Sequence, residues 1–181
     1  MGLRTVLTYE DYAALPADGR RYEIHDGELS VMPVPGTRHQ QVSRNLVVVL
    51  HLHVKERRLG EVFHAPTDCI LTDTTIVQPD IVFIDAGRLS IISERGIEGT
   101  PTLVVEVLSP STVHLDRGSK AQLYARHGVL FYWIVDPGIR TIDAYTLLAG
   151  AYQRAARFEG DEPRALPPFP DLVLEPAAIW A

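Results

Sequence analysis

The sequence predicts a fold of the α+β or mixed α/β class, in which helices flank one central mixed sheet. Short strand-like runs are spread along the whole chain, and one long segment, from Thr37 to Leu59, has apolar residues at helical spacing. A strand-helix-strand unit from Thr102 to Asp136 implies a parallel strand pair, while hairpins towards both ends of the chain imply antiparallel pairs. Since no linker or repeat interrupts this pattern, we expect residues 1–181 to form a single domain.

The composition is that of a folded, mildly acidic protein. The 181 residues are 46% hydrophobic with a net charge of −6, which excludes a disordered chain. No apolar stretch approaches the roughly 20 residues of a membrane helix, and the N-terminus turns acidic before a signal-like core develops. We therefore expect no membrane association and a cytoplasmic location. The acidic balance argues against a broadly basic nucleic-acid surface but allows local positive charge, for which Gly19–Arg21 and Lys55–Arg58 are candidates.

The N-terminal region predicts a short helix followed by a hairpin. Thr8 is placed to cap a helix that ends before Pro16. An Asp-Gly pair at 26–27 separates two apolar runs, Tyr22–Ile24 and Leu29–Val31, which is typical of a two-residue hairpin turn.

A long helix is predicted from Thr37 to Leu59, with Gly60 as its stop signal. The β-branched run Val47–Val49 favours a strand, but the length of the segment and the stop signal favour a helix. The apolar stripe consists of Val42, Leu46, Val49, Leu50 and Val54.

The rest of the chain predicts strands and one further helix. That helix is expected from Asp116, its N-cap, to His127, with Gly128 beyond its end. Ser93–Thr100 predicts a polar loop, and the C-terminal tail predicts a short apolar run and one helical turn. Strands are expected to begin at Glu61, Cys69, Asp80, Thr102, Val129, Thr141 and Ala151.

Glu106 interrupts the apolar stretch TLVVEVL, which otherwise predicts a buried strand. Removing an unpaired carboxylate from water costs several kcal/mol, so a cation, a metal or solvent at the strand end must balance its charge. Asp80 opens another predicted strand, and Lys120 lies on the helix that follows Glu106. Two carboxylates on neighbouring strands suit a hard cation such as Mg²⁺, and a nearby ammonium can stabilise a phosphate or orient the attacking water.

Each candidate also has a purely structural interpretation. Asp80 could belong to a turn at the start of its strand, and Glu106 could be a buried acid that only supports the fold. Lys120 could pair with Asp116 one helical turn earlier, a contact of about 0.2–0.5 kcal/mol. A capping or surface position suits His39 better than the site does.

Several motifs occur in the order found in a known family. They include QPDIVFI at 78–84, VVEVLSPST at 104–112 and a D-x-x-x-K-x-x-x-Y pattern at 116–124. Together with RYEIHDGEL in the first hairpin and GVLFYWIVDP at 128–137, they resemble the Uma-two family of restriction-endonuclease-like proteins, part of the PD-(D/E)XK nuclease superfamily. The resemblance spans nearly the whole chain.

The resemblance implies a restriction-endonuclease-like core and Mg²⁺- or Mn²⁺-dependent cleavage of DNA phosphodiester bonds, with a homodimer as one assembly it allows. Asp80 and Glu106 match the motif carboxylates and would be catalytic metal ligands, with the Val107 carbonyl as a further ligand. The superfamily places a lysine two residues after the glutamate, where this chain has Leu108. Lys120 would replace it from the next helix.

Glu23 matches an early glutamate of the family and would be an outer carboxylate of the catalytic group, although its position also fits an ordinary charge at a strand edge. The departure at Leu108 leaves open a second function, a catalytically inactive module that keeps the nuclease fold and serves binding or structure. A metal-dependent hydrolase of another phosphate ester is a third alternative.

Overall fold

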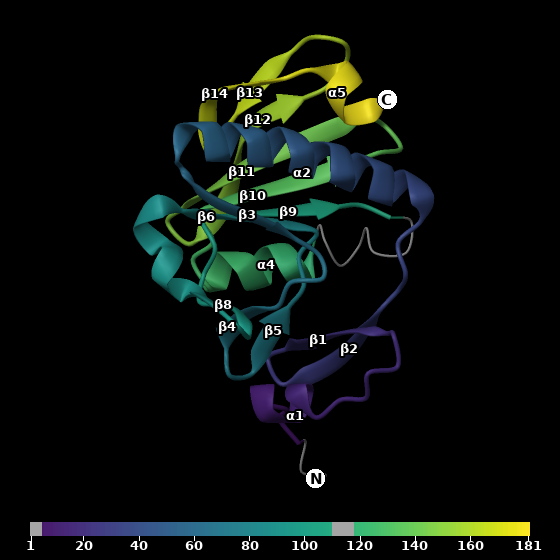
Figure 1. Ribbon diagram of the computed structural model, residues 1–181, viewed down its shortest axis with the longest axis vertical. Coiled ribbons are helices and arrows are strands. Elements are labelled where there is room, and N and C mark those ends of the chain that lie inside the picture. The colour runs from purple at the N-terminus through teal and green to yellow at the C-terminus, as the bar shows by residue number, and fades with distance from the viewer. Residues whose placement is uncertain (1–4, 110–117) are drawn as a thin grey trace.

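The computed structural model describes residues 5–109 and 118–181, and its centre is a six-stranded mixed sheet (Figure 1). In spatial order its strands are β12 (Ala151–Phe158), β11 (Thr141–Leu148), β10 (Phe131–Asp136), β9 (Leu103–Val107), β6 (Ile81–Asp85) and β3 (Gly60–His64). β9 and β10 run parallel, which confirms the predicted strand-helix-strand unit. The other neighbouring strands of this sheet are antiparallel.

A second six-stranded sheet lies on the far side of helix α4 (Ser119–Arg126) from the central sheet (Figure 1). Its strands, in spatial order, are β2 (Glu28–Met32), β1 (Arg21–His25), β5 (Thr75–Val77), β4 (Cys69–Thr72), β8 (Gly96–Glu98) and β7 (Ile92–Ser93). The predicted hairpin is confirmed as β1 and β2, and its turn residues Asp26 and Gly27 both have the positive φ that such a turn requires.

The sequence predicted one central sheet and did not reveal this second one. The predicted loop Ser93–Thr100 contains β8 and the end of β7, and it is preceded by a 3₁₀ helix, η1 (Ala86–Ile91). Strands of two or three residues show too little alternation to be recognised locally. The pairing of β4 with β8, which is parallel, depends on contacts between distant parts of the chain.

Helix α2 (Thr37–Arg57) covers one face of the central sheet (Figure 1), which confirms the long helix. Its buried stripe, including Leu46 and Leu50, packs in one cluster with Val105 and Trp133 of the sheet. The β-branched run Val47–Val49 lies inside this helix, because burial of the stripe outweighs the local preference for a strand.

Helix α4 covers the opposite face of the central sheet (Figure 1). Its Leu123 packs in a second cluster with Val104 and Ile134. Since side chains alternate along a strand, Glu106 projects to the same face as Val104, towards α4. The predicted N-cap Asp116 lies outside the described residues, and the described part of the helix has Gly118 as its N-cap.

The chain ends in a small hairpin, β13 (Arg164–Leu166) and β14 (Phe169–Leu174), followed by the predicted helical turn, α5 (Pro176–Trp180). Arg38 of α2 donates to the Trp180 carbonyl at 3.0 Å, which holds α5 against α2. The short helix at the other end is confirmed as α1 (Tyr9–Ala13). Within residues 5–109 and 118–181, no helix combines the length and the hydropathy that crossing a membrane requires.

Candidate active site

Asp80 and Glu106 face each other across two antiparallel strands. Ile81 of β6 pairs with Val105 of β9, so the next pair in the same register is Asp80 with Glu106. Directly opposed residues of an antiparallel pair project to the same face, which brings the two carboxylates together under α4. Both line a cavity of about 30 Å³, roughly the volume of one water molecule, at the end of β9.

Asp80 is held by a backbone group and by a histidine. Its Oδ2 accepts a hydrogen bond from the Val107 N–H at 2.8 Å and lies 3.0 Å from Nε2 of His39. A carboxylate can only accept, so in this contact His39 would donate through Nε2. His39 is 8% exposed, so the predicted capping or surface position was wrong. A distance of 41 residues along the chain separated the two partners, and no local pattern could join them.

Glu106 is balanced by an ammonium and a phenol, which answers the question raised by its place in a buried strand. Its Oε1 accepts from Lys120 Nζ at 3.0 Å and from the Tyr124 hydroxyl at 2.6 Å. Both donors come from α4, one helical turn apart, and both are buried. Burial, and after it the charge of Glu106, raises the pKa of Tyr124 well above its usual range, so the phenol stays protonated and donates.

Glu23 joins the same group from the second sheet. Its Oε1 accepts from the Gln78 N–H at 2.9 Å and from Lys120 Nζ at 3.3 Å, while its Oε2 lies 2.8 Å from Nε2 of His25. Burial acts to raise the pKa of Glu23, but Lys120, His25 and the Gln78 N–H together lower it to about 2. Glu23 is fully buried, so an ordinary strand-edge charge does not describe it.

Lys120 therefore bridges two carboxylates that belong to different sheets. The alternative partner, Asp116, lies outside the described residues. The contacts of Lys120 with Glu23 and Glu106 are buried, unlike an ion pair on a helix surface. Leu108 packs in the apolar cluster beneath α4 and is 6% exposed. The ammonium at this end of β9 thus comes from α4, while position 108 contributes apolar packing.

The donor set suits a hard divalent cation. Among residues 5–109 and 118–181, no group of three or more His, Cys, Asp or Glu side chains has the arrangement of a metal site. Mg²⁺ does not need one, because it usually binds one or two carboxylates and keeps several waters. The Val107 N–H points to Asp80, and in an extended strand the carbonyl of the same residue points to that side too. Asp80, Glu106 and this carbonyl would supply three oxygen ligands around the small cavity.

Two further residues of this region were not predicted to be site residues. Arg21 lines the cavity, and its guanidinium is fixed by the side-chain and backbone oxygens of Gln78, at 3.2 and 2.7 Å. The basic run Gly19–Arg21 was the available signal, but it did not distinguish a site residue from a solvated charge. Gln78, which also binds Glu23, gave no signal beyond its place before the predicted strand.

The chain is similar to known proteins in both sequence and fold. Residues 9–177 match the model of the Uma2 family, whose description is "Putative restriction endonuclease". Among solved structures, the chain is similar to a putative nuclease belonging to DUF820 from Anabaena variabilis ATCC 29413, with a TM-score of 0.75 and 24% sequence identity. That alignment covers 96% of this chain and 97% of the other, and it confirms the fold. The comparison with curated proteins gives no match.

Proposed function

Because the chain belongs to the Uma2 family of putative restriction endonucleases, we propose that it is a metal-dependent endonuclease that hydrolyses DNA phosphodiester bonds. The observation that carries this proposal is a buried ammonium, Lys120 Nζ, 3.0 Å from Glu106 in the wall of a cavity that Asp80 also lines. This arrangement combines two acidic ligands and a fixed positive charge, the groups that hydrolysis of a phosphodiester requires.

Asp80, Glu106 and the Val107 carbonyl would hold the metal, for which Mg²⁺ and Mn²⁺ are the candidates. A divalent ion bound there supplies a Lewis acid for the phosphate oxygen and lowers the pKa of bound water. His39 and the Val107 N–H fix the carboxylate of Asp80 from two directions, so its orientation is set before substrate binds.

Lys120 would stabilise the negative charge that builds up on the phosphate and orient the attacking water. Glu23 would hold the Lys120 ammonium in place, because a carboxylate whose pKa is about 2 stays ionised at neutral pH and attracts it. Arg21, which also lines the cavity, would add a second cation towards the phosphate. In this arrangement Glu23 is a positioning residue and Lys120 a catalytic one.

A catalytically inactive module with the same fold is the second candidate, and the observation that favours it is Leu108. The superfamily lysine is absent there, and the position is filled by apolar packing. The contact between Lys120 and Glu106 favours the enzyme, since an inactive fold has no need to keep a buried ammonium beside two carboxylates.

Nicking of supercoiled plasmid in Mg²⁺ or Mn²⁺, with a chelator control, tests the proposal. We expect metal-dependent nicking by the wild type and a loss of about 10²–10⁴-fold in Lys120→Gln, which removes the charge and keeps a hydrogen-bond donor. Asp80→Asn, nearly identical in shape, should lose activity as well. Asp161→Asn, at an exposed position far along the chain from these residues, is the control.

Melting curves of each variant guard against simple unfolding, because removing one partner of a buried ion pair is destabilising. A folded Lys120→Gln protein that nicks at the wild-type rate contradicts the role of Lys120. A wild type that shows no metal-dependent nicking, with folded protein and both metals, supports the inactive module.

A further inference from the structure

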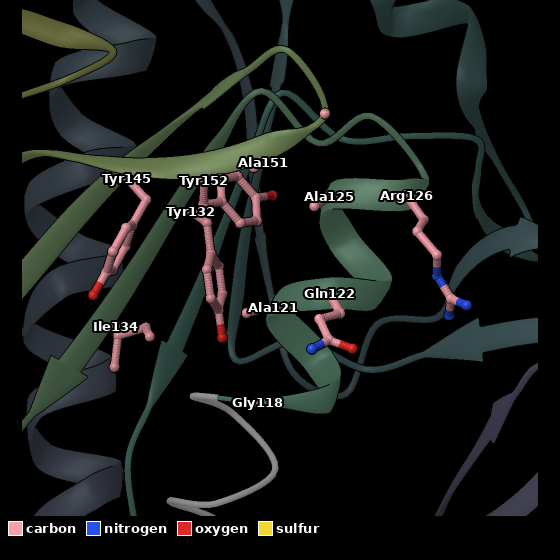
Figure 2. A pocket seen from close by; sticks show the side chains of 11 residues that line it. Gly118, Ala121, Gln122, Ala125, Arg126, Tyr132, Ile134, Tyr145, Ala151 and Tyr152 are labelled. Atoms are coloured by element: carbon pink, nitrogen blue, oxygen red, sulfur yellow. The ribbon is translucent and has the colours of Figure 1, made fainter.

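A second, larger pocket lies on the α4 side of the central sheet (Figure 2). It has a volume of about 600 Å³ and lies between α4 and the strands β10 to β12. Figure 2 shows three tyrosines, Tyr132, Tyr145 and Tyr152, on the strand side and the small residues Ala121 and Ala125 on the helix side. Pockets of about 300–1,000 Å³ that are mostly apolar, with a few polar groups, are typical of small-molecule sites.

The strand side of the pocket is an aromatic wall. The ring centroids of Tyr132 and Tyr152 are 5.4 Å apart, and Tyr145 lies 6.4 Å from each of them. The Tyr152 hydroxyl donates to the Val129 carbonyl at 2.8 Å, which fixes that ring. The three rings come from three different strands of the central sheet, so the wall is preformed. Aromatic side chains of this kind stack nucleobases, irrespective of sequence.

The helix side leaves room for a planar ligand. Ala121 and Ala125 lie one turn apart on α4 and add only a methyl group each to the lining. Gln122, between them, supplies an amide that can both donate and accept a hydrogen bond. Arg126 also lines the pocket, but it points away from the tyrosines (Figure 2) and pairs with Asp26 at 2.7 Å.

The pocket begins one strand away from Glu106. Ile134 of β10 lines the pocket and is the register partner of Glu106 in β9, and neighbouring strands are about 4.8 Å apart. Helix α4 connects the two places, because Lys120 binds Glu106 and the next residue, Ala121, lines the pocket. A nucleotide whose phosphate lies at Glu106 can therefore place an adjacent base in the pocket.

Two arginines of β12 lie near the tyrosine wall. Asp143 of β11 is buried and lies beside Tyr145, and it accepts hydrogen bonds from Arg154 at 3.4 Å and from Arg157 at 3.2 Å. Arg157 also pairs with Glu159 at 3.5 Å, whereas the Arg154 side chain is half exposed, and its guanidinium suits a phosphate next to a stacked base.

We propose that the tyrosine pocket binds an unstacked nucleobase of the DNA strand that is cut at the Asp80–Glu106 site. The proposal rests on the proposed function, and it adds that the enzyme takes a single-stranded or locally opened substrate, since a base inside a duplex cannot reach the aromatic wall. The pocket contributes binding and positioning, and no covalent step occurs in it.

Binding of short labelled single-stranded oligonucleotides, measured by fluorescence anisotropy in a chelator, tests the proposal without cleavage. The matched probe has the same backbone but abasic residues in place of every base. We expect the wild type to bind the base-bearing strand about tenfold more tightly than the abasic strand, because one stacked base contributes on that order. Equal affinities in the wild type would overturn the proposal.

Two kinds of variant locate the effect in the pocket. Ala125→Leu fills the space opposite the tyrosines and should remove the preference for bases, while Ala13→Leu, at an exposed position of α1, should keep it. Tyr145→Leu should also remove the preference, and Tyr145→Phe, which keeps the ring, should retain it. If Ala125→Leu does not fold, the comparison of Tyr145→Leu with Tyr145→Phe tests the proposal instead. A folded Tyr145→Leu protein that keeps the wild-type preference for bases would show that the pocket does not bind them.

A further arm separates a strand from a free nucleotide. Deoxynucleoside monophosphates should compete with the labelled strand only weakly; if they bind as tightly as the strand, the pocket serves free nucleotides and the proposal is wrong. The plasmid assay is read independently. If the protein nicks plasmid but shows no preference for bases, the pocket proposal is wrong and the proposed nuclease function stands. If it prefers bases but does not nick plasmid, the pocket binds bases in a catalytically inactive module.

Discussion

Glu23 shows at the residue scale how this protein keeps a charge that is fully buried. Four groups surround its carboxylate or act on its pKa: Lys120, His25, the Gln78 N–H and the low-polarity surroundings. The first three outweigh the last, and the pKa falls from its ordinary value of 4.5 to about 2. The folded state therefore stabilises the ionised form of Glu23.

The pKa of Glu23 predicts a specific loss of stability in acid. Because the folded-state pKa lies below the ordinary value, the carboxylate stabilises the folded protein above pH 4.5 and loses this contribution as pH falls towards 2. The contribution at neutral pH is about 3 kcal/mol. Glu23→Gln should therefore lower the free energy of unfolding at pH 7 in denaturant titrations, and the difference from wild type should shrink below pH 4.5.

Glu61→Gln, at an exposed position of β3, is the matched control and should change stability little at either pH. If Glu23→Gln is as stable as the wild type at pH 7, Glu106 alone balances the charge of Lys120, and the Glu23 carboxylate does not stabilise the fold.

At the element scale, the sequence predicted what local periodicity and turn chemistry determine. The long helix, the Asp-Gly hairpin and the strands around Glu106 and Trp133 agree with their predictions, because each has a long apolar pattern or a diagnostic turn. The strands β5, β7 and β8 have two or three residues each. β7 and β8 form a short hairpin, but the pairs that build the sheet, β1 with β5 and β4 with β8, join distant segments. The site shows the same limit, since Lys120 and Glu23 meet across 97 residues of chain.

The end of α2 provides a prediction for an element. Arg58, its C-cap, adopts φ 54 and ψ 40, the left-handed conformation in which glycine meets no steric penalty. Arg58→Gly should raise the free energy of unfolding by about 1 kcal/mol. Arg57→Gly, one residue earlier and still helical, should lower it by about 1 kcal/mol. Denaturant titration of both variants measures the difference, and the same sign for both would contradict this account of the helix end.

At the scale of the whole molecule, a buried ionic group joins the two sheets through α4. Glu106 comes from the central sheet, Glu23 from the second sheet, and Lys120 from the helix that packs between them. In the region that the structure describes, the cavity at this junction contains the carboxylates of Asp80 and Glu106 together with the Val107 backbone. A divalent ion bound there would contact two central strands and would be bound by the folded state alone.

Metal binding should therefore raise the melting temperature of the whole protein. An ion at 100 times its dissociation constant adds about 2.7 kcal/mol to the free energy of unfolding, which for a chain of this length corresponds to about 5–10 °C. We expect millimolar Mn²⁺ to produce such a shift in the wild type and in Asp161→Asn, an exposed control. Asp80→Asn and Glu106→Gln should show none, because each lacks one acidic ligand. Differential scanning fluorimetry measures all four proteins with Mn²⁺ and with a chelator. If Mn²⁺ leaves the melting temperature of the wild type unchanged, no metal binds in the Asp80–Glu106 cavity. If Asp80→Asn shows the same shift as the wild type, the metal binds elsewhere.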